Sequence, residues 1–351
     1  FFASIFLTVI GIWFSEYIFK IIDLPTDVIP LAVEYFNVYA LGFVFFFGFQ
    51  GTSAILRGMG DSKTPVYFLV ISTVVNIVLD ILFVVVFKWG IVGVAAATVI
   101  AQAGAFFTIV WYLNKYHSFL DFSPLKMKFH KDIFMKSLRI GLPSGIQQTF
   151  VALGFLALYR IVNIFGVPTI AAYSIAMRID SFAVMPAMNF SAAISTFVGQ
   201  NIGANKFERI GKGLKSTLLM INTISISITI IAVIFAGPIF GLFTDNPEVI
   251  EIGKQYIYIV TPFYVILSTM FIFNGVLRGA GATIIPMIIT ILALWAIRVP
   301  ISWLLSVELG SIGIWWGIPI AWAFGVICSY IYYATGKWKK MAVVKHEPSN
   351  N

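Results

Sequence analysis

The sequence has 351 residues, of which 60% are hydrophobic and only 11% charged, with a mean hydropathy of +0.95. These values exclude a water-soluble domain of this length and indicate a chain that lives in a lipid bilayer. The net charge of +8 falls in the loops between apolar stretches, where it indicates membrane orientation and forms no continuous patch for nucleic acid. Cys328 is the single cysteine, which excludes an internal disulfide.

Apolar stretches of about 20 residues or more recur along the chain, each long enough to cross a hydrocarbon core of about 30 Å as a helix. Residues 230–235 form an unbroken apolar run, whereas a strand of a membrane barrel would alternate. The predicted fold class is therefore an all-α polytopic membrane protein. We expect ten spans, at about 1–22, 31–57, 65–88, 90–113, 138–160, 170–199, 216–243, 252–278, 284–306 and 311–335.

The loops between these spans alternate in charge. Segments 23–27 and 245–251 are acidic, whereas 57–63 and 206–215 are basic. Because Lys and Arg gather in cytoplasmic loops, we expect the basic linker 114–137 and the tail 337–351 to lie in the cytoplasm. The C-terminus is then cytoplasmic.

An internal repeat runs through the chain at an offset of 221 residues. Leu56-Arg57-Gly58 matches Leu277-Arg278-Gly279, Tyr35 matches Tyr256, and Gly60 with Pro65 matches Gly281 with Pro286. The segment from about 132 to 221 has no N-terminal counterpart, so we expect roughly 90 further residues with two helices to precede Phe1.

The repeat predicts twelve helices in the intact protein, in two pseudo-symmetric six-helix lobes related by an axis along the membrane normal. Ten of the helices fall in this chain. An incomplete N-lobe, with helices 3–6, takes 1–113, and a C-lobe, with helices 7–12, takes 138–336.

Several motifs follow one another in a distinctive order. They are Leu56-Arg57-Gly58-Met59-Gly60-Asp61-Ser62-Lys63-Thr64-Pro65, then Asn76-Ile77-Val78-Leu79-Asp80, then Gly93-Val94-Ala95-Ala96-Ala97-Thr98, and finally Val198-Gly199-Gln200-Asn201-Ile202-Gly203-Ala204. In this order and spacing they resemble the multidrug and toxic compound extrusion (MATE) family of prokaryotic type, from Phe1 to about Lys340.

The resemblance implies a secondary active efflux transporter of the plasma membrane. Such a protein exports amphipathic, often cationic, drugs or toxic compounds by antiport with H⁺ or Na⁺, alternating between inward and outward states. It implies a small drug-like substrate and the lipid bilayer as partners, no nucleic acid, no organic cofactor, and a protein that functions as a monomer.

Asp80 is a carboxylate well inside a predicted span, and its cost there makes it a functional candidate. The turn to the next span centres near Trp89, so Asp80 and Thr98 lie at equal depth, about 13 Å below the surface. Asn76 lies one turn from Asp80 on the same face, and Gln102 matches its depth on the partner helix. Carboxylate, amide and hydroxyl oxygens suit a small hard cation, and a desolvated Asp could equally bind a proton.

The resemblance implies that Asn76, Asp80 and Thr98 stand where the family forms its N-lobe cation site, together with an Asp on the first helix, which this chain does not include. The alternative is a polar seam that only joins two helices.

Arg178 and Asp180 lie within the span 170–199. We expect them to pair with other helices or with each other, and substrate contact is the alternative. Gln147 and Gln148 are further candidates for the substrate cavity. No acidic residue occurs in 140–160 or 252–278, so a C-lobe sodium site of the kind found in one branch of the family is not expected. Nor is a metal site, because the histidines stand alone.

Two rival functions differ in what they would require. A lipid-linked precursor flippase of the same superfamily would carry a more cationic central cavity. An integral-membrane enzyme would need clustered histidines or carboxylates near one interface.

Overall fold

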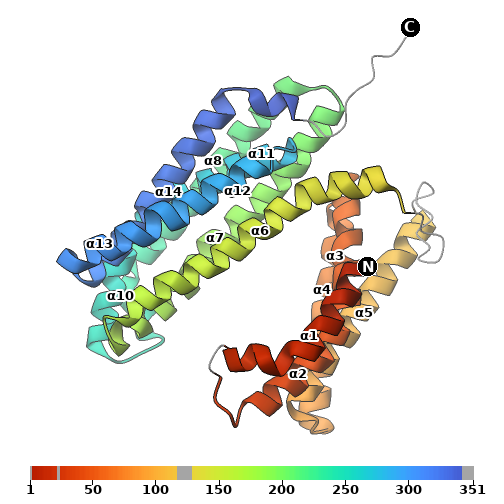
Figure 1. Ribbon diagram of the computed structural model, residues 1–351, viewed down its shortest axis with the longest axis horizontal. Helices are drawn as coiled ribbons and strands as arrows, with labels where there is room; N and C mark the ends of the chain where they lie inside the picture. Colours follow the sequence, from red (N-terminus) through yellow and green to blue (C-terminus); the bar gives the residue numbers. More distant parts are fainter. Residues whose placement is uncertain (1, 22–23, 117–128, 342–351) are drawn as a thin grey trace. The chain divides into compact units, whose positions relative to one another are not determined.

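The computed structural model describes residues 2–21, 24–116 and 129–341, and in these ranges the only regular elements are helices (Figure 1). The chain forms two compact units, Phe1–Lys128 and Phe129–Asn351. The predicted all-α fold class is confirmed.

The first unit is built around one long helix, α5 (Gly90–Tyr116), which packs against three others. Its Ala and Gly residues supply a buried face that neighbouring backbones can approach closely. The other elements are α1 (Phe2–Ile21), α2 (Ile29–Leu41), α3 (Phe43–Gly58), and α4 (Lys63–Ile81), which continues as the π-helical turn η1 (Leu82–Val86).

The second unit packs around α11 (Tyr264–Gly279), whose neighbours in space are α7 (Val167–Gly203), α8 (Phe207–Ile234) and α14 (Ser311–Ala334) (Figure 1). The remaining elements are α6 (Lys131–Asn163), α9 (Ala236–Gly241), α10 (Pro247–Val260), η3 (Thr261–Phe263), α12 (Ile284–Ile291), the π-helical segment η4 (Leu292–Arg298), α13 (Val299–Leu309) and η5 (Lys337–Lys340).

Nine helices in the described ranges are long and apolar enough to span a membrane, or ten if the bent pair α2 and α3 forms one span. Several of these helices are bent or interrupted. The bend of 46° between α2 and α3 lies at Gly42, where an added Cβ would come within 2.7 Å of Val99 Cγ2 on α5. Between α10 and α11, Pro262 replaces the α-helical pattern with a 3₁₀ turn.

Described helices extend into the predicted linker 114–137 from both sides. Helix α5 continues to Tyr116 and α6 begins at Lys131, because a helix rich in Lys can extend beyond the apolar core into water. Residues 117–128 of that prediction lie outside the described residues. The predicted tail begins with the turn η5, whose Trp338 is buried, and residues 342–351 also lie outside the described part.

The internal repeat is visible in the backbone. Helices α3 and α11 begin and end 221 residues apart, and so do the first residues of α4 and α12. A glycine in the left-handed conformation follows each of these helices by two residues, Gly60 after α3 with φ of 97° and Gly281 after α11 with φ of 84°. The amide of each glycine donates to the motif Arg carbonyl (3.1 and 2.9 Å), and the next amide donates to the motif Leu carbonyl (2.9 and 2.9 Å). The Leu-Arg-Gly motif is therefore a helix C-cap of the Schellman type in both copies.

Helices α7 and α11 meet almost backbone to backbone. A Cβ added at Gly275 would lie 2.5 Å from the carbonyl oxygen of Ser191, and one added at Gly279 would collide with the carbonyl of Ser195. Arg278 donates to the Ser191 hydroxyl (2.8 Å), which donates in turn to the Phe271 carbonyl (2.6 Å). Small residues four apart on both helices permit this contact, as is usual inside membranes.

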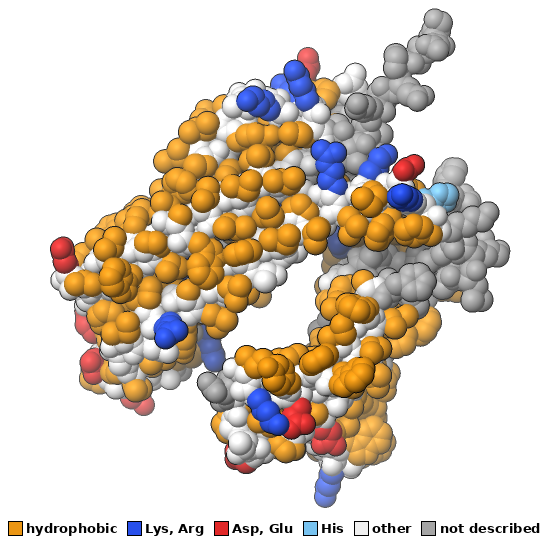
Figure 2. All heavy atoms as spheres, in the orientation of Figure 1, with side chains coloured by type: hydrophobic (Ala, Val, Ile, Leu, Met, Phe, Trp, Pro, Cys, Tyr) orange, Lys and Arg blue, Asp and Glu red, His pale blue; other side chains and the backbone are white. Residues whose placement is uncertain are grey.

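Charged side chains collect at the helix ends. Figure 2 shows hydrophobic side chains along the helices of each unit, and Lys, Arg, Asp and Glu mainly near their ends. In the second unit the N-terminal turns of α8 carry Lys206, Arg209, Lys212 and Lys215, whereas the segment before and within α10 carries Asp245, Glu248 and Glu251.

Candidate functional site

An open cavity in the first unit lies between α3, α4 and α5. It measures about 500 Å³, including the space at its mouth. Aromatic and aliphatic groups share its wall with amides and hydroxyls, a mixture typical of small-molecule sites. The lining residues are Phe46, Phe49, Gln50, Leu69, Ser72, Thr73, Asn76, Thr98, Ala101, Gln102 and Ala105.

Three of the four predicted cation-coupling residues, Asn76, Thr98 and Gln102, line this cavity. The Asn76 side-chain amide donates to the Thr98 hydroxyl across α4 and α5 (3.4 Å), and that hydroxyl donates to the Val94 carbonyl (3.0 Å). Because its proton is already engaged, the Thr98 oxygen can act only as an acceptor, toward Asn76 or toward a cation.

Asp80, the fourth predicted residue, does not line the cavity. It lies one turn beyond Asn76 in the last turn of α4, just before the π-helical turn η1. Its Oδ1 atom is buried and has no hydrogen-bond partner among the described residues. An unpaired carboxylate oxygen in a helix bundle is costly.

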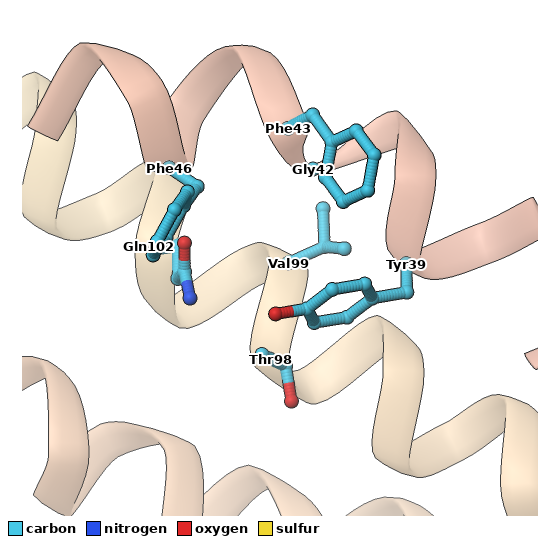
Figure 3. Close-up of a pocket in the computed structure, with 7 residues that line it drawn as sticks. All are labelled: Tyr39, Gly42, Phe43, Phe46, Thr98, Val99 and Gln102. Carbon is cyan, nitrogen blue, oxygen red and sulfur yellow. The ribbon is translucent and has the colours of Figure 1, made fainter. Parts of the chain in front are cut away.

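Tyr35 and Tyr39 of α2 join the surroundings of Asp80 to the polar face of α5. Tyr35 lies close enough to Asp80 to interact with it electrostatically, and its ring stacks on that of Tyr39 with centroids 5.9 Å apart. Tyr39 in turn lines a small pocket with Thr98 and Gln102. Figure 3 shows this pocket, with Tyr39, Phe43 and Phe46 on one side and the α5 residues on the other.

The sequence did not single out Tyr35 or Tyr39 as site residues. The repeat marks Tyr35 as one of its matched positions. Residue spacing, however, relates only helices that are joined by a short turn, and α2 is not joined to α4 or α5 in this way.

In the second unit, Asp180 of α7 accepts two short hydrogen bonds. The hydroxyls of Tyr256 and Tyr264 donate to its two carboxylate oxygens, each over 2.6 Å. These tyrosines are only 1% and 0% exposed. Both oxygens of this buried carboxylate therefore have protein partners.

Arg178 is exposed, and its guanidinium lies over the Phe243 ring, 5.8 Å from the centroid. It forms no ion pair with Asp180 within the described structure, because the two side chains leave α7 in different directions. Of the two expected alternatives, Asp180 pairs with other helices through the tyrosines, and a pairing with Arg178 is not observed among the described residues.

The two predicted glutamines of α6 also differ. Gln147 donates to the Thr290 hydroxyl (2.7 Å) and lies 3.5 Å from the Pro286 carbonyl, so it ties α6 to α12. Gln148 is exposed. Of the pair, only Gln148 has its side chain free for a ligand in the described structure.

Comparisons with known proteins agree with this architecture. The profile of the MatE family matches residues 1–82 and 143–304. The probable multidrug resistance protein YpnP of Bacillus subtilis (strain 168) is 32% identical over 332 residues, which are 94% of this chain and 74% of that protein. The probable multidrug resistance protein NorM of Thermotoga maritima is 29% identical over 336 residues, 93% of this chain and 71% of that protein.

Solved structures show the shared fold. An outward-facing multidrug resistance MATE family transporter of the MOP superfamily superposes with a TM-score of 0.89 at 21% identity, over 97% of this chain and 77% of that one. A mutant of the MATE transporter VcmN of Vibrio cholerae superposes with a TM-score of 0.87 at 18% identity, over 95% and 76% of the two chains. The chain is thus a multi-pass membrane transporter and not an enzyme, and it belongs to the multidrug and toxic compound extrusion (MatE) family.

Proposed function

We propose that this transporter exports amphipathic, cationic small molecules in exchange for H⁺ or Na⁺, and that the exchanged cation binds at Asp80. The observation that carries the proposal is the buried Oδ1 of Asp80, which has no hydrogen-bond partner among the described residues. A carboxylate left in this way gains most from a cation or a proton, because a membrane helix bundle offers little water to solvate it.

The neighbours of Asp80 suit that role. Asn76, one turn before Asp80 on α4, and Thr98 of α5, to which Asn76 donates, supply an amide and a hydroxyl oxygen, and such hard oxygen ligands favour a small hard cation. Because Asn76 and Thr98 also line the cavity, binding of the cation would change the affinity of the cavity for its ligand. That shared wall is a physical route for antiport, in which cation and drug favour different states.

The cavity wall fits the proposed substrate class. Phe46 and Phe49 offer flat apolar faces, and Gln50 and Gln102 offer amide oxygens. A planar organic cation would gain apolar contact and cation–π attraction from the rings. In the second unit, Arg178 and Gln148 are exposed and remain candidates for drug contact, whereas Asp180 and Gln147 are engaged with protein partners.

The test is drug uptake into everted vesicles that contain the protein expressed from its complete gene. Uptake by wild type and Asp80→Asn is compared under a proton gradient and a sodium gradient imposed separately. We expect one gradient to drive wild-type uptake. Asp80→Asn should reduce uptake to the level without a gradient, because the neutral amide cannot compensate the positive charge of the cation.

Glu34→Gln is the matched control, since Glu34 is an exposed carboxylate on α2 of the same unit, and this variant should keep wild-type uptake. Normal gradient-driven uptake by Asp80→Asn would refute the proposed coupling site. Loss of uptake in both variants would point to a general effect of removing charge.

A further inference from the structure

A second buried polar cluster lies inside the second unit, around Asp180. Both oxygens of that carboxylate are taken by Tyr256 of α10 and Tyr264 of α11. These two tyrosines flank the 3₁₀ break at Thr261–Phe263, so Asp180 fastens α7 to both halves of a broken span.

Arg298, the last residue of the π-helical segment η4, faces the same cluster. It is 5% exposed, and its guanidinium lies 5.3 Å from the centroid of the Phe155 ring. It interacts electrostatically with Asp180 and lies beside the hydroxyl of Tyr173. Its Nε has no hydrogen-bond partner among the described residues. Asp180 and Arg298 therefore belong to one buried cluster, and no direct ion pair joins them in the described structure.

Aromatic rings make up much of the described surroundings of Asp180. From α7 and α6 come Tyr173 and Tyr159, whose rings are 6.1 Å apart. From α14 comes Trp315, which stacks on Tyr173 at 5.6 Å and meets Tyr256 edge-on at 5.0 Å, and α14 contains no Asp, Glu, Lys, Arg or His. Asp180 and its tyrosine partners thus lie among aromatic side chains.

The internal repeat allows the residues around Asp180 to be compared with the equivalent residues of the first unit. At the offset of 221, Tyr256 corresponds to Tyr35; Tyr256 donates to Asp180, and Tyr35 interacts electrostatically with Asp80. Helix α4, which carries Asp80, corresponds to the span that carries Arg298. At this offset Arg298 stands opposite Ile77, about one turn before Asp80. Equivalent helices therefore bring opposite charges to the two interiors.

We propose that Arg298 is a built-in cation that serves as the permanent counter-charge of Asp180, so that the second unit takes up no coupling ion and exchange is confined to the first. The inference rests on the proposed function, since it assigns cation exchange to Asp80. A tethered guanidinium cannot leave, and it stays charged at every physiological pH. Replacing it with a neutral side chain leaves Asp180 uncompensated, and an ion from solution then takes its place.

The test counts ions bound to purified full-length protein in detergent. Radioactive sodium is measured by equilibrium binding, and protons are measured with a pH indicator in weakly buffered solution. The variants are Asp80→Asn, Asp180→Asn, Arg298→Gln, Arg298→Lys and the double variant Asp180→Asn with Arg298→Gln. Only monodisperse fractions from gel filtration are compared.

We expect Asp180→Asn to leave the wild-type count unchanged and Arg298→Gln to double it, from one ion per molecule to two. The double variant should return to one, and Arg298→Lys should match wild type because it keeps the charge. A lower count in Asp180→Asn with Arg298 intact, or no added ion in monodisperse Arg298→Gln, would overturn the proposal. If Arg298→Gln does not fold, the Asp180→Asn count alone decides. Failure of Asp80→Asn to change the count would refute the proposed function instead.

Discussion

Asp80 and Asp180 are interior carboxylates with different surroundings. Asp80 has a buried oxygen without a hydrogen-bond partner in the described structure, whereas both oxygens of Asp180 accept from tyrosine hydroxyls. A group with its partners in place stabilises a fold, and a group without them is available for exchange. At the scale of the residue, the same side chain is therefore structural in one unit and a candidate coupling site in the other.

Removing either hydroxyl that faces Asp180 should destabilise the second unit. Tyr264→Phe or Tyr256→Phe deletes one hydrogen bond to a charged acceptor, worth about 1.5–3 kcal/mol. We expect a lower thermal midpoint for each, measured by fluorescence-detected gel filtration after heating. Tyr258→Phe is the control, since Tyr258 is 50% exposed on the same helix, and an equal drop in that variant would contradict the assignment.

The residues of the candidate site were predictable only in part. Asn76, Asp80 and Thr98 follow from spacing, because a short turn fixes the relative depth of two consecutive helices. The partners of Asp180 are 76 and 84 residues away along the chain, and no periodicity specifies which distant helix meets which. Arg178 and Asp180 do not pair in the described structure, because residues two apart on a helix point in different directions.

The positions of the helices along the chain were easy to predict, but their bends and interruptions were not. Apolar length gave their number and approximate bounds, but the 46° bend between α2 and α3 and the π-helical segments η1 and η4 left no clear mark in the pattern. Such breaks depend on what a neighbouring helix presents, as Val99 does at Gly42. In both units a π-helical segment lies next to the charged residue, Asp80 or Arg298, that the proposals use.

The contact between α7 and α11 should tolerate no added methyl group. Gly275→Ala places a Cβ against the Ser191 carbonyl, and overpacking of this kind costs about 1–3 kcal/mol. We expect a lower thermal midpoint and a lower yield of folded protein. Gly211→Ala, on α8 where an added Cβ meets nothing within 4 Å, should instead be neutral or slightly stabilising. Equal losses in the two variants would argue against close packing as the cause.

At the scale of the whole molecule, the repeat was the most informative feature of the sequence. An offset found from a few matched residues also gives the start and end of α3 and α11 and their shared glycine caps. Duplication preserves backbone architecture better than polar chemistry, because caps and close packing constrain every copy while one cation site can suffice. The divergence at Asp80 and Arg298 is an example.

The charge pattern of the loops predicts the orientation of the chain. Lys337 and Asp245 are exposed and lie at segments of opposite charge. In a Cys328→Ser background, Lys337→Cys should react with an impermeant maleimide only from the cytoplasmic side, and Asp245→Cys only from outside. Labelling of intact cells and of everted vesicles measures this, and the reverse result would invert the topology.

The meeting of α7 and α11 through Gly275 and Gly279 has a mechanical consequence. Side chains can change rotamer to absorb a small shift, but carbonyl groups in contact with glycine Cα atoms cannot, so the two helices resist sliding along one another. We expect them to act as one rigid pair within the second unit. Because Arg278 contacts α7 near one end of this packed pair and Asp180 binds Tyr264 near the other, we expect both ends to move together, and bending to occur at Pro262 and in η4.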